Sequence, residues 1–106
     1  MTLNKLLQEI TKLNNVDKLP KYVKVSDVSW SQIMINNKWQ NSVYKWGICK
    51  KDKKYIYFET DDERGYVFNL KYFNTEEDAV QYAYNVLLLK NNTFDAEEKR
   101  KKKILK

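Results

Sequence analysis

The sequence contains no histidine, one cysteine, one proline and only two glycines. Histidine is the side chain that most readily gains and loses a proton near neutral pH, so its absence removes the commonest general acid or base. Cys49 has neither a histidine to activate it nor a second cysteine, which excludes an intramolecular disulfide bond and zinc sites built from Cys and His. We therefore expect a protein that is not an enzyme and that holds no metal or cofactor.

With only Gly47 and Gly65, the chain lacks the glycine-rich loops that hold nucleotide phosphates. No apolar run approaches the length of about 18 residues that indicates a membrane span. The N-terminal stretch carries charges inside its apolar pattern and has no cleavage site of small residues, so it does not resemble a secretory signal. These features, with a single cysteine, predict a cytoplasmic protein without membrane contact.

The net charge of +6 comes almost entirely from lysine, because only Arg64 and Arg100 among the 20 basic residues are arginine. Specific recognition of bases and phosphates favours the two-pronged hydrogen bonding of arginine. High Lys, Asn, Tyr and Ile are also typical of an AT-rich genome. The charge is unevenly distributed, with seven acidic and two basic residues in 59–78 and an excess of lysine elsewhere. Nucleic-acid binding is therefore possible but less favoured.

A first helix is predicted at the N-terminus, where apolar residues recur at helical spacing. Thr2 supplies an N-cap, and Asn14-Asn15 followed by Pro20 end the helix. Strand-like and helix-like spacings conflict from Tyr22 to Asn41, where we expect extended structure with a turn at Asn36-Asn37. The apolar stripe of the helix consists of Leu3, Leu6, Leu7, Ile10 and Leu13.

Three strands joined by turns are predicted next. Residues 44–49 alternate between apolar and other side chains, as a half-buried strand requires. A polar hairpin turn follows at Lys51–Lys54, and Tyr55–Thr60 is rich in aromatic and β-branched residues. Gly65 supplies a left-handed position for the next turn, and residues 66–70 alternate again.

The alternation also predicts which side chains share a face of the sheet. An open face of tyrosines bordered by charge resembles the composition of protein interfaces, although ordinary cross-strand packing gives the same pattern. We expect one face to consist of Trp46, Ile48, Ile56, Phe58 and Phe68, directed toward the helices. We expect the opposite face to consist of Lys45, Tyr55, Tyr57, Glu59, Val67 and Asn69.

A long amphipathic helix is predicted after the strands, capped by Asn74 or Thr75, with a buried face that includes Ala83 and Leu87. Asn91-Asn92 should end it, and a short helix from Asp95 should fray into a basic tail. The predicted class is α+β: an N-terminal helix, an antiparallel meander of three to four strands, the long helix packed on the sheet, and a short basic C-terminal helix or tail. We expect one domain over residues 1–94 and a charged segment over 95–106.

The acidic run after the second strand admits three interpretations. Glu59, Asp61, Asp62 and Glu63 could bind a divalent cation, but they lack the alternating ligand spacing and central glycine of a calcium loop. A solvated turn is the plainest alternative. A surface that meets a basic partner is the third, since complementary charge accelerates encounter.

The sequence Arg64–Phe68 half matches the aromatic strand motif of RNA-recognition domains. Val67, Asn69 and Lys71 stand where that motif has a small residue, an apolar residue and an aromatic residue. That fold also begins with a strand, whereas this chain begins with a predicted helix. RNA recognition is therefore a minor alternative.

The middle of the chain resembles bacterial immunity protein family fifty-nine, whose members are small α+β partners of polymorphic toxins. The similarity covers roughly Gly47 to Leu89, and its sharpest part is the Glu-Arg-Gly turn followed by Asn-Leu-Lys and Phe. The basic tail beyond Asn91 has no counterpart in the resemblance. The matching residues are Gly47-Ile48-Cys49, Tyr55-Ile56-Tyr57-Phe58, Asp62-Glu63-Arg64-Gly65, Asn69-Leu70-Lys71, Phe73 and Thr75-Glu76-Glu77-Asp78-Ala79.

The resemblance implies an immunity protein that binds a cognate toxin domain and neutralises it by stoichiometric protein-protein interaction. A small nucleic-acid-binding or regulatory protein and a phage-encoded inhibitor of a host defence enzyme are the alternatives. Glu63 and Arg64 belong to the matched motif, whereas the other candidate contacts follow from surface physics. The predicted partner-binding residues are Glu59, Asp61, Asp62, Glu63 and Arg64 in the turn, with Tyr55, Tyr57 and Tyr66 as aromatic anchors.

Overall fold

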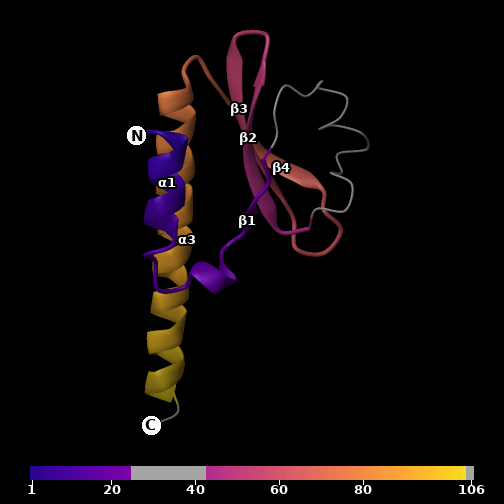
Figure 1. The fold of residues 1–106 in the computed structure, drawn as a ribbon. Coiled ribbons are helices and arrows are strands. Elements are labelled where there is room, and N and C mark those ends of the chain that lie inside the picture. The colour runs from indigo at the N-terminus through magenta and orange to yellow at the C-terminus, as the bar shows by residue number, and fades with distance from the viewer. Residues whose placement is uncertain (25–42, 105–106) are drawn as a thin grey trace. The chain divides into compact units, whose positions relative to one another are not determined.

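A computed structural model describes residues 1–24 and 43–104 of the chain (Figure 1). The expected α+β class is confirmed. The chain divides into a helical unit, Met1–Leu19 with Val80–Lys106, and a sheet unit, Pro20–Ala79. The elements are α1 (Leu3–Ile10), the 3-10 helix η1 (Val16–Lys18), β1 (Lys21–Tyr22), β2 (Lys45–Lys51), β3 (Lys54–Thr60), β4 (Val67–Phe73) and α3 (Glu76–Ile104).

The sheet has the strand order β1-β2-β3-β4. The expected antiparallel meander is confirmed for β2, β3 and β4. The short strand β1 pairs with β2 in parallel, so the sheet is mixed rather than wholly antiparallel. The expected turn at Asn36-Asn37 lies outside the described residues.

The β2–β3 hairpin turns through only two residues, Asp52 and Lys53, whose φ angles are 47° and 63°. Two consecutive left-handed residues match the twist of a two-residue hairpin. With Lys51 opposite Lys54, each even-numbered residue of β2 lies opposite an odd-numbered residue of β3. This register decides which side chains share a face.

The face assignment made from alternation is therefore wrong. Trp46 lies opposite Glu59, and Ile48 lies opposite Tyr57, so these side chains share one face. The expectation placed Trp46 and Ile48 with Ile56 and Phe58 instead. Alternation within a strand is correct here, but the hairpin length shifts one strand against the other by a single residue and reverses its faces.

The face with Trp46 holds a row of aromatic rings. Tyr22 and Trp46 have ring centroids 4.9 Å apart, and Trp46 stacks on Tyr57 at 6.3 Å. Aromatic pairs at these separations add stability beyond the area that they bury. This row links β1, β2 and β3.

The opposite face holds a cluster of four buried side chains, packed against Val23 and Leu70. Burial raises the pKa of the Cys49 thiol to about 11, so it stays protonated near neutral pH. A Cβ atom added to Gly47 would lie 2.7 Å from the Phe58 ring and 2.9 Å from the Val23 carbonyl oxygen, which explains the glycine. The buried members are Cys49, Ile56, Phe58 and Val67.

Both predicted helix caps are confirmed. The Thr2 side chain accepts a hydrogen bond from the Lys5 amide at 3.2 Å, and the Thr75 side chain accepts one from the Asp78 amide at 3.2 Å. Such caps satisfy amides that have no partner within the first helical turn. No helix in the described part of the chain is long and apolar enough to span a membrane.

Helix α3 does not end at Asn91-Asn92 but continues to Ile104, so the separate helix expected from Asp95 is wrong. Asn15 donates its amide to the Asn91 side chain at 2.9 Å and its side-chain nitrogen to the Asp95 carboxylate at 2.8 Å. The segment after α1 thus lies against α3 (Figure 1). A buried partner gives Asn91 a reason to stand inside a helix, whereas the sequence alone suggests a helix end.

Candidate partner-binding surface

The β3–β4 turn is organised by the carboxylate of Asp61. One carboxylate oxygen accepts hydrogen bonds from the backbone amides of Arg64, Gly65 and Tyr66, at 2.8, 2.6 and 3.2 Å. Desolvation acts to raise the pKa of Asp61, but these backbone hydrogen bonds outweigh it and hold the pKa below its ordinary value. Gly65 has a φ of 74°, which confirms the expected left-handed position. The turn is therefore held in one shape by its first residue.

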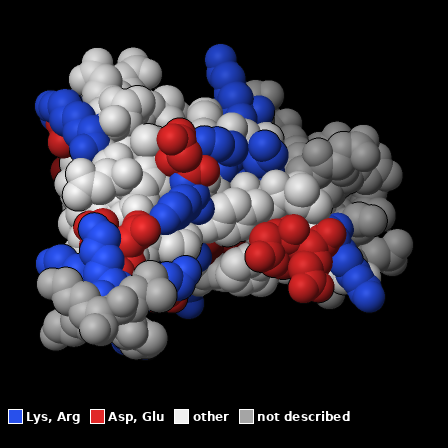
Figure 2. Space-filling view, turned by 90° about the horizontal axis from the view of Figure 1, so that it is seen from below, with Lys and Arg blue, Asp and Glu red and all other residues white. Residues whose placement is uncertain are grey.

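The next three residues, Asp62, Glu63 and Arg64, are exposed. Their side chains extend from a turn that is fixed by the neighbouring carboxylate, so little backbone freedom remains at this position. Figure 2 shows a compact group of acidic side chains with a basic side chain at its border. The turn therefore presents two carboxylates and one guanidinium to solvent on an ordered backbone.

Glu59, although predicted as part of the same acidic group, is only 2% exposed. It accepts a hydrogen bond from the Asn69 side-chain amide. Asn69 has a φ of 53° and lies where the register of β3 and β4 shifts. Glu59 is thus part of the packed sheet, and its side chain does not contribute to the acidic surface.

The three predicted tyrosines lie in different surroundings. Tyr57 is fully buried and stacks on Trp46. Tyr55 is half-buried at the opposite end of β3, with the Lys50 ammonium 5.7 Å from its ring centroid. Tyr66 is 39% exposed and directly follows the acidic turn. The structure therefore brings Asp61–Arg64 and Tyr66 together, places Tyr55 at the far end of β3, and leaves Tyr57 and Glu59 buried.

Phe68 is a surface residue that the sequence interpretation missed. We expected it to face the helices with the core side chains, yet it is 46% exposed. It lies opposite Glu59, two residues after Tyr66 on the same side of the strand. The spacing of two aromatic residues directly after an acidic turn could have indicated this pair.

Tyr44 borders the turn from the start of β2. Its amide donates to the Asp61 carbonyl oxygen at 2.7 Å, and its φ is 51°. Burial, with a smaller contribution from the carboxylates of Glu59 and Asp62, raises the pKa of the Tyr44 hydroxyl. Tyr44 therefore stays neutral beside the acidic group.

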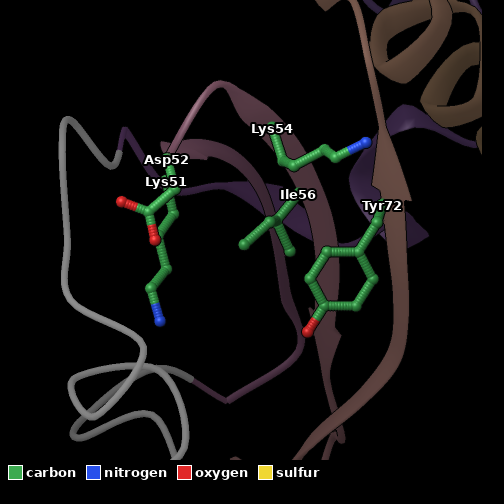
Figure 3. Close-up of a pocket in the computed structure, with 5 residues that line it drawn as sticks. All are labelled: Lys51, Asp52, Lys54, Ile56 and Tyr72. Carbon is green, nitrogen blue, oxygen red and sulfur yellow. The ribbon is translucent and has the colours of Figure 1, made fainter.

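An open pocket of about 290 Å³ lies near the β2–β3 hairpin. In Figure 3 the Ile56 side chain and the Tyr72 ring border the same space, while the Lys54 ammonium points away from it. Lys54 donates to the Asn74 side chain instead. The pocket is lined by Lys51, Asp52, Lys54, Ile56 and Tyr72. The floor of the pocket is apolar, and its rim carries both positive and negative side chains.

Among the described residues, no three His, Cys, Asp or Glu side chains form a group that could hold a metal ion. Comparisons with protein-family models, curated proteins and solved structures find no match for this chain. We call the set Asp61–Arg64, Tyr66 and Phe68 the turn surface.

Proposed function

We propose that this protein is an immunity protein that binds a cognate bacterial toxin domain one to one and neutralises it. The observation that supports this proposal is the turn surface, in which Asp62 and Glu63 extend from a turn fixed by three hydrogen bonds to Asp61. Neutralisation by occupancy requires affinity and no chemistry from the binding protein.

A preformed turn favours tight binding because the backbone has little freedom left to lose when the complex forms. The two exposed carboxylates attract a basic surface on the partner and orient it during approach. The rest of the chain carries most of its 20 basic residues, so the acidic turn is a local site of opposite sign. The favoured partner is therefore a protein with a basic binding surface.

The test uses the recombinant protein that is encoded beside the gene of this chain as the probe. The Glu63→Lys variant should lower the association rate constant about tenfold at low salt, because the attraction that steers the encounter is reversed. Glu97→Lys is the matched control, since Glu97 is also exposed but lies in α3. Stopped-flow or surface plasmon resonance measures the rate, and co-expression measures rescue of cells from the probe.

Absence of a wild-type complex, or of rescue, would contradict neutralisation. Equal effects of Glu63→Lys and Glu97→Lys would remove the turn from the binding site while leaving the function in place. The two results therefore separate the function from its location.

A nucleic-acid-binding function is the second candidate, supported by the exposed basic end of α3. Lys99–Lys102 are all exposed, and no acidic residue interrupts them. Binding through such a segment weakens steeply as salt rises, because it releases counterions from the nucleic acid. A mobility-shift titration at two salt concentrations tests this candidate, and lack of binding at low salt ends it.

A further inference from the structure

Two aromatic side chains lie exposed beside the acidic turn. Tyr66 is 39% exposed and Phe68 is 46% exposed, whereas Trp46, Tyr57 and Phe58 of the same sheet are buried; Tyr72, at 54%, is exposed on the opposite face. Burial of an aromatic side chain is favourable because it removes a large apolar area from water. Together the two rings form an apolar surface that a partner could bury.

The strand register places the two rings on one face. The Asp61 amide donates to the Tyr66 carbonyl oxygen at 2.9 Å, and Phe68 lies opposite Glu59. Val67, between them, points to the opposite face and belongs to the buried cluster there. Tyr66 and Phe68 are thus neighbours along one side of β4.

The neighbouring charges indicate what would cover the rings. Asp62 and Glu63 are exposed four and three residues before Tyr66 in the chain, and the exposed Arg64 lies between them and the ring. Protein interfaces commonly combine a central cluster of aromatic residues with a charged rim that remains close to solvent. A partner that buries the rings and carries Lys or Arg side chains at its border would complement these carboxylates.

We propose that Tyr66 and Phe68 form the apolar centre of the toxin-binding surface, with Asp62 and Glu63 as its acidic rim. The partner then presents an apolar patch flanked by Lys or Arg side chains. This inference rests on the proposed function for its partner and assigns to Phe68 a role that the sequence did not suggest. We expect truncation of the two rings to cause most of the loss of binding affinity. We expect changes to the two carboxylates to cause most of the change in association rate.

The test compares two exposed aromatic residues of the same strand. Phe68→Ala should raise the dissociation constant about tenfold or more, because central aromatic residues carry most of the binding energy. Tyr72→Ala is the matched control: Tyr72 is 54% exposed on β4 but lies opposite Ile56, on the other face. The probe is again the recombinant protein encoded beside the gene, and isothermal titration calorimetry gives the constant.

Tyr66→Ala provides a second variant outside the regular part of the strand, in case Phe68→Ala does not fold, and circular dichroism checks both. We expect Tyr66→Ala and Phe68→Ala to raise the dissociation constant. We expect Tyr72→Ala to change it by no more than about twofold. A wild-type complex that tolerates loss of both rings, or that loses as much with Tyr72→Ala, overturns the inference and leaves neutralisation intact. Absence of any wild-type complex removes the proposed function and the inference together.

Discussion

The two turns at the ends of β3 are built in different ways. The β2–β3 turn consists of Asp52 and Lys53, both with positive φ and neither a glycine. The β3–β4 turn uses Gly65 at its positive-φ position and closes on the carboxylate of Asp61. One turn is set by the pairing of its strands, and the other by a side chain that binds its backbone.

The two turns also differ in charge. Lysines surround the first turn, including the paired Lys51 and Lys54, whereas Asp62 and Glu63 extend from the second. The Asp61 anchor stabilises the folded turn, and it also reduces the backbone freedom that would be lost if a partner bound there. This difference is consistent with the partner-binding role proposed for the second turn.

Loss of the Asp61 carboxylate should have the largest effect on either turn. Asp61→Ala leaves three backbone amides without their acceptor, so the midpoint of urea unfolding should fall more than for any other single change in these turns. Asp62→Ala is the matched control, since Asp62 is adjacent and exposed. An equal midpoint for the two variants would contradict the anchoring role.

The same carboxylate predicts a dependence of stability on pH. Because the folded state lowers the pKa of Asp61 below its ordinary value, the stabilisation is present above that ordinary value and is lost as the pH falls through the lower folded value. Asp61→Asn should therefore show a shallower loss of unfolding free energy below about pH 4 than wild type. Urea titrations at several pH values measure it, and parallel curves would contradict the prediction.

Gly65→Ala should have the next largest effect. At a φ of 74° an alanine is strained, so the free energy of unfolding should fall by roughly 1–2 kcal/mol. Chemical denaturation checks the value. A neutral result would show that the turn adopts another shape without cost.

Lys53→Gly should have the smallest effect and the opposite sign. The φ of 63° at Lys53 suits glycine, and glycine is favoured in a two-residue hairpin. Relief of this strain, reduced by the greater freedom of glycine in the unfolded chain, should raise stability by about 0.5 kcal/mol. A loss of stability in the same denaturation assay would contradict the view that Lys53 is strained at its positive φ.

Features that depend on residues close together in the chain could be predicted from the sequence. Thr2, Thr75 and Gly65 stand where their local chemistry predicts a cap or a left-handed turn, and the three antiparallel strands follow from alternation. These signals act within a few residues, so a single sequence contains them.

Features that depend on residues far apart in the chain could not be predicted from the sequence. The side chain that accommodates Asn91 within α3 is Asn15, which is 76 residues away in sequence. The burial of Glu59 depends on Asn69 and on the register of two strands. The exposure of Phe68 depends on its position on β4, the last strand of the sheet among the described residues, which alternation within the strand does not specify.

Hydrogen exchange, measured on the complex with the protein encoded by the neighbouring gene, tests whether the turn surface is the part of this protein that contacts its partner. The amides of residues 62–68 should exchange more slowly in the complex than in the free protein, while those of residues 51–55 at the other end of β3 should be unchanged. Protection of residues 51–55 without protection of 62–68 would contradict the account.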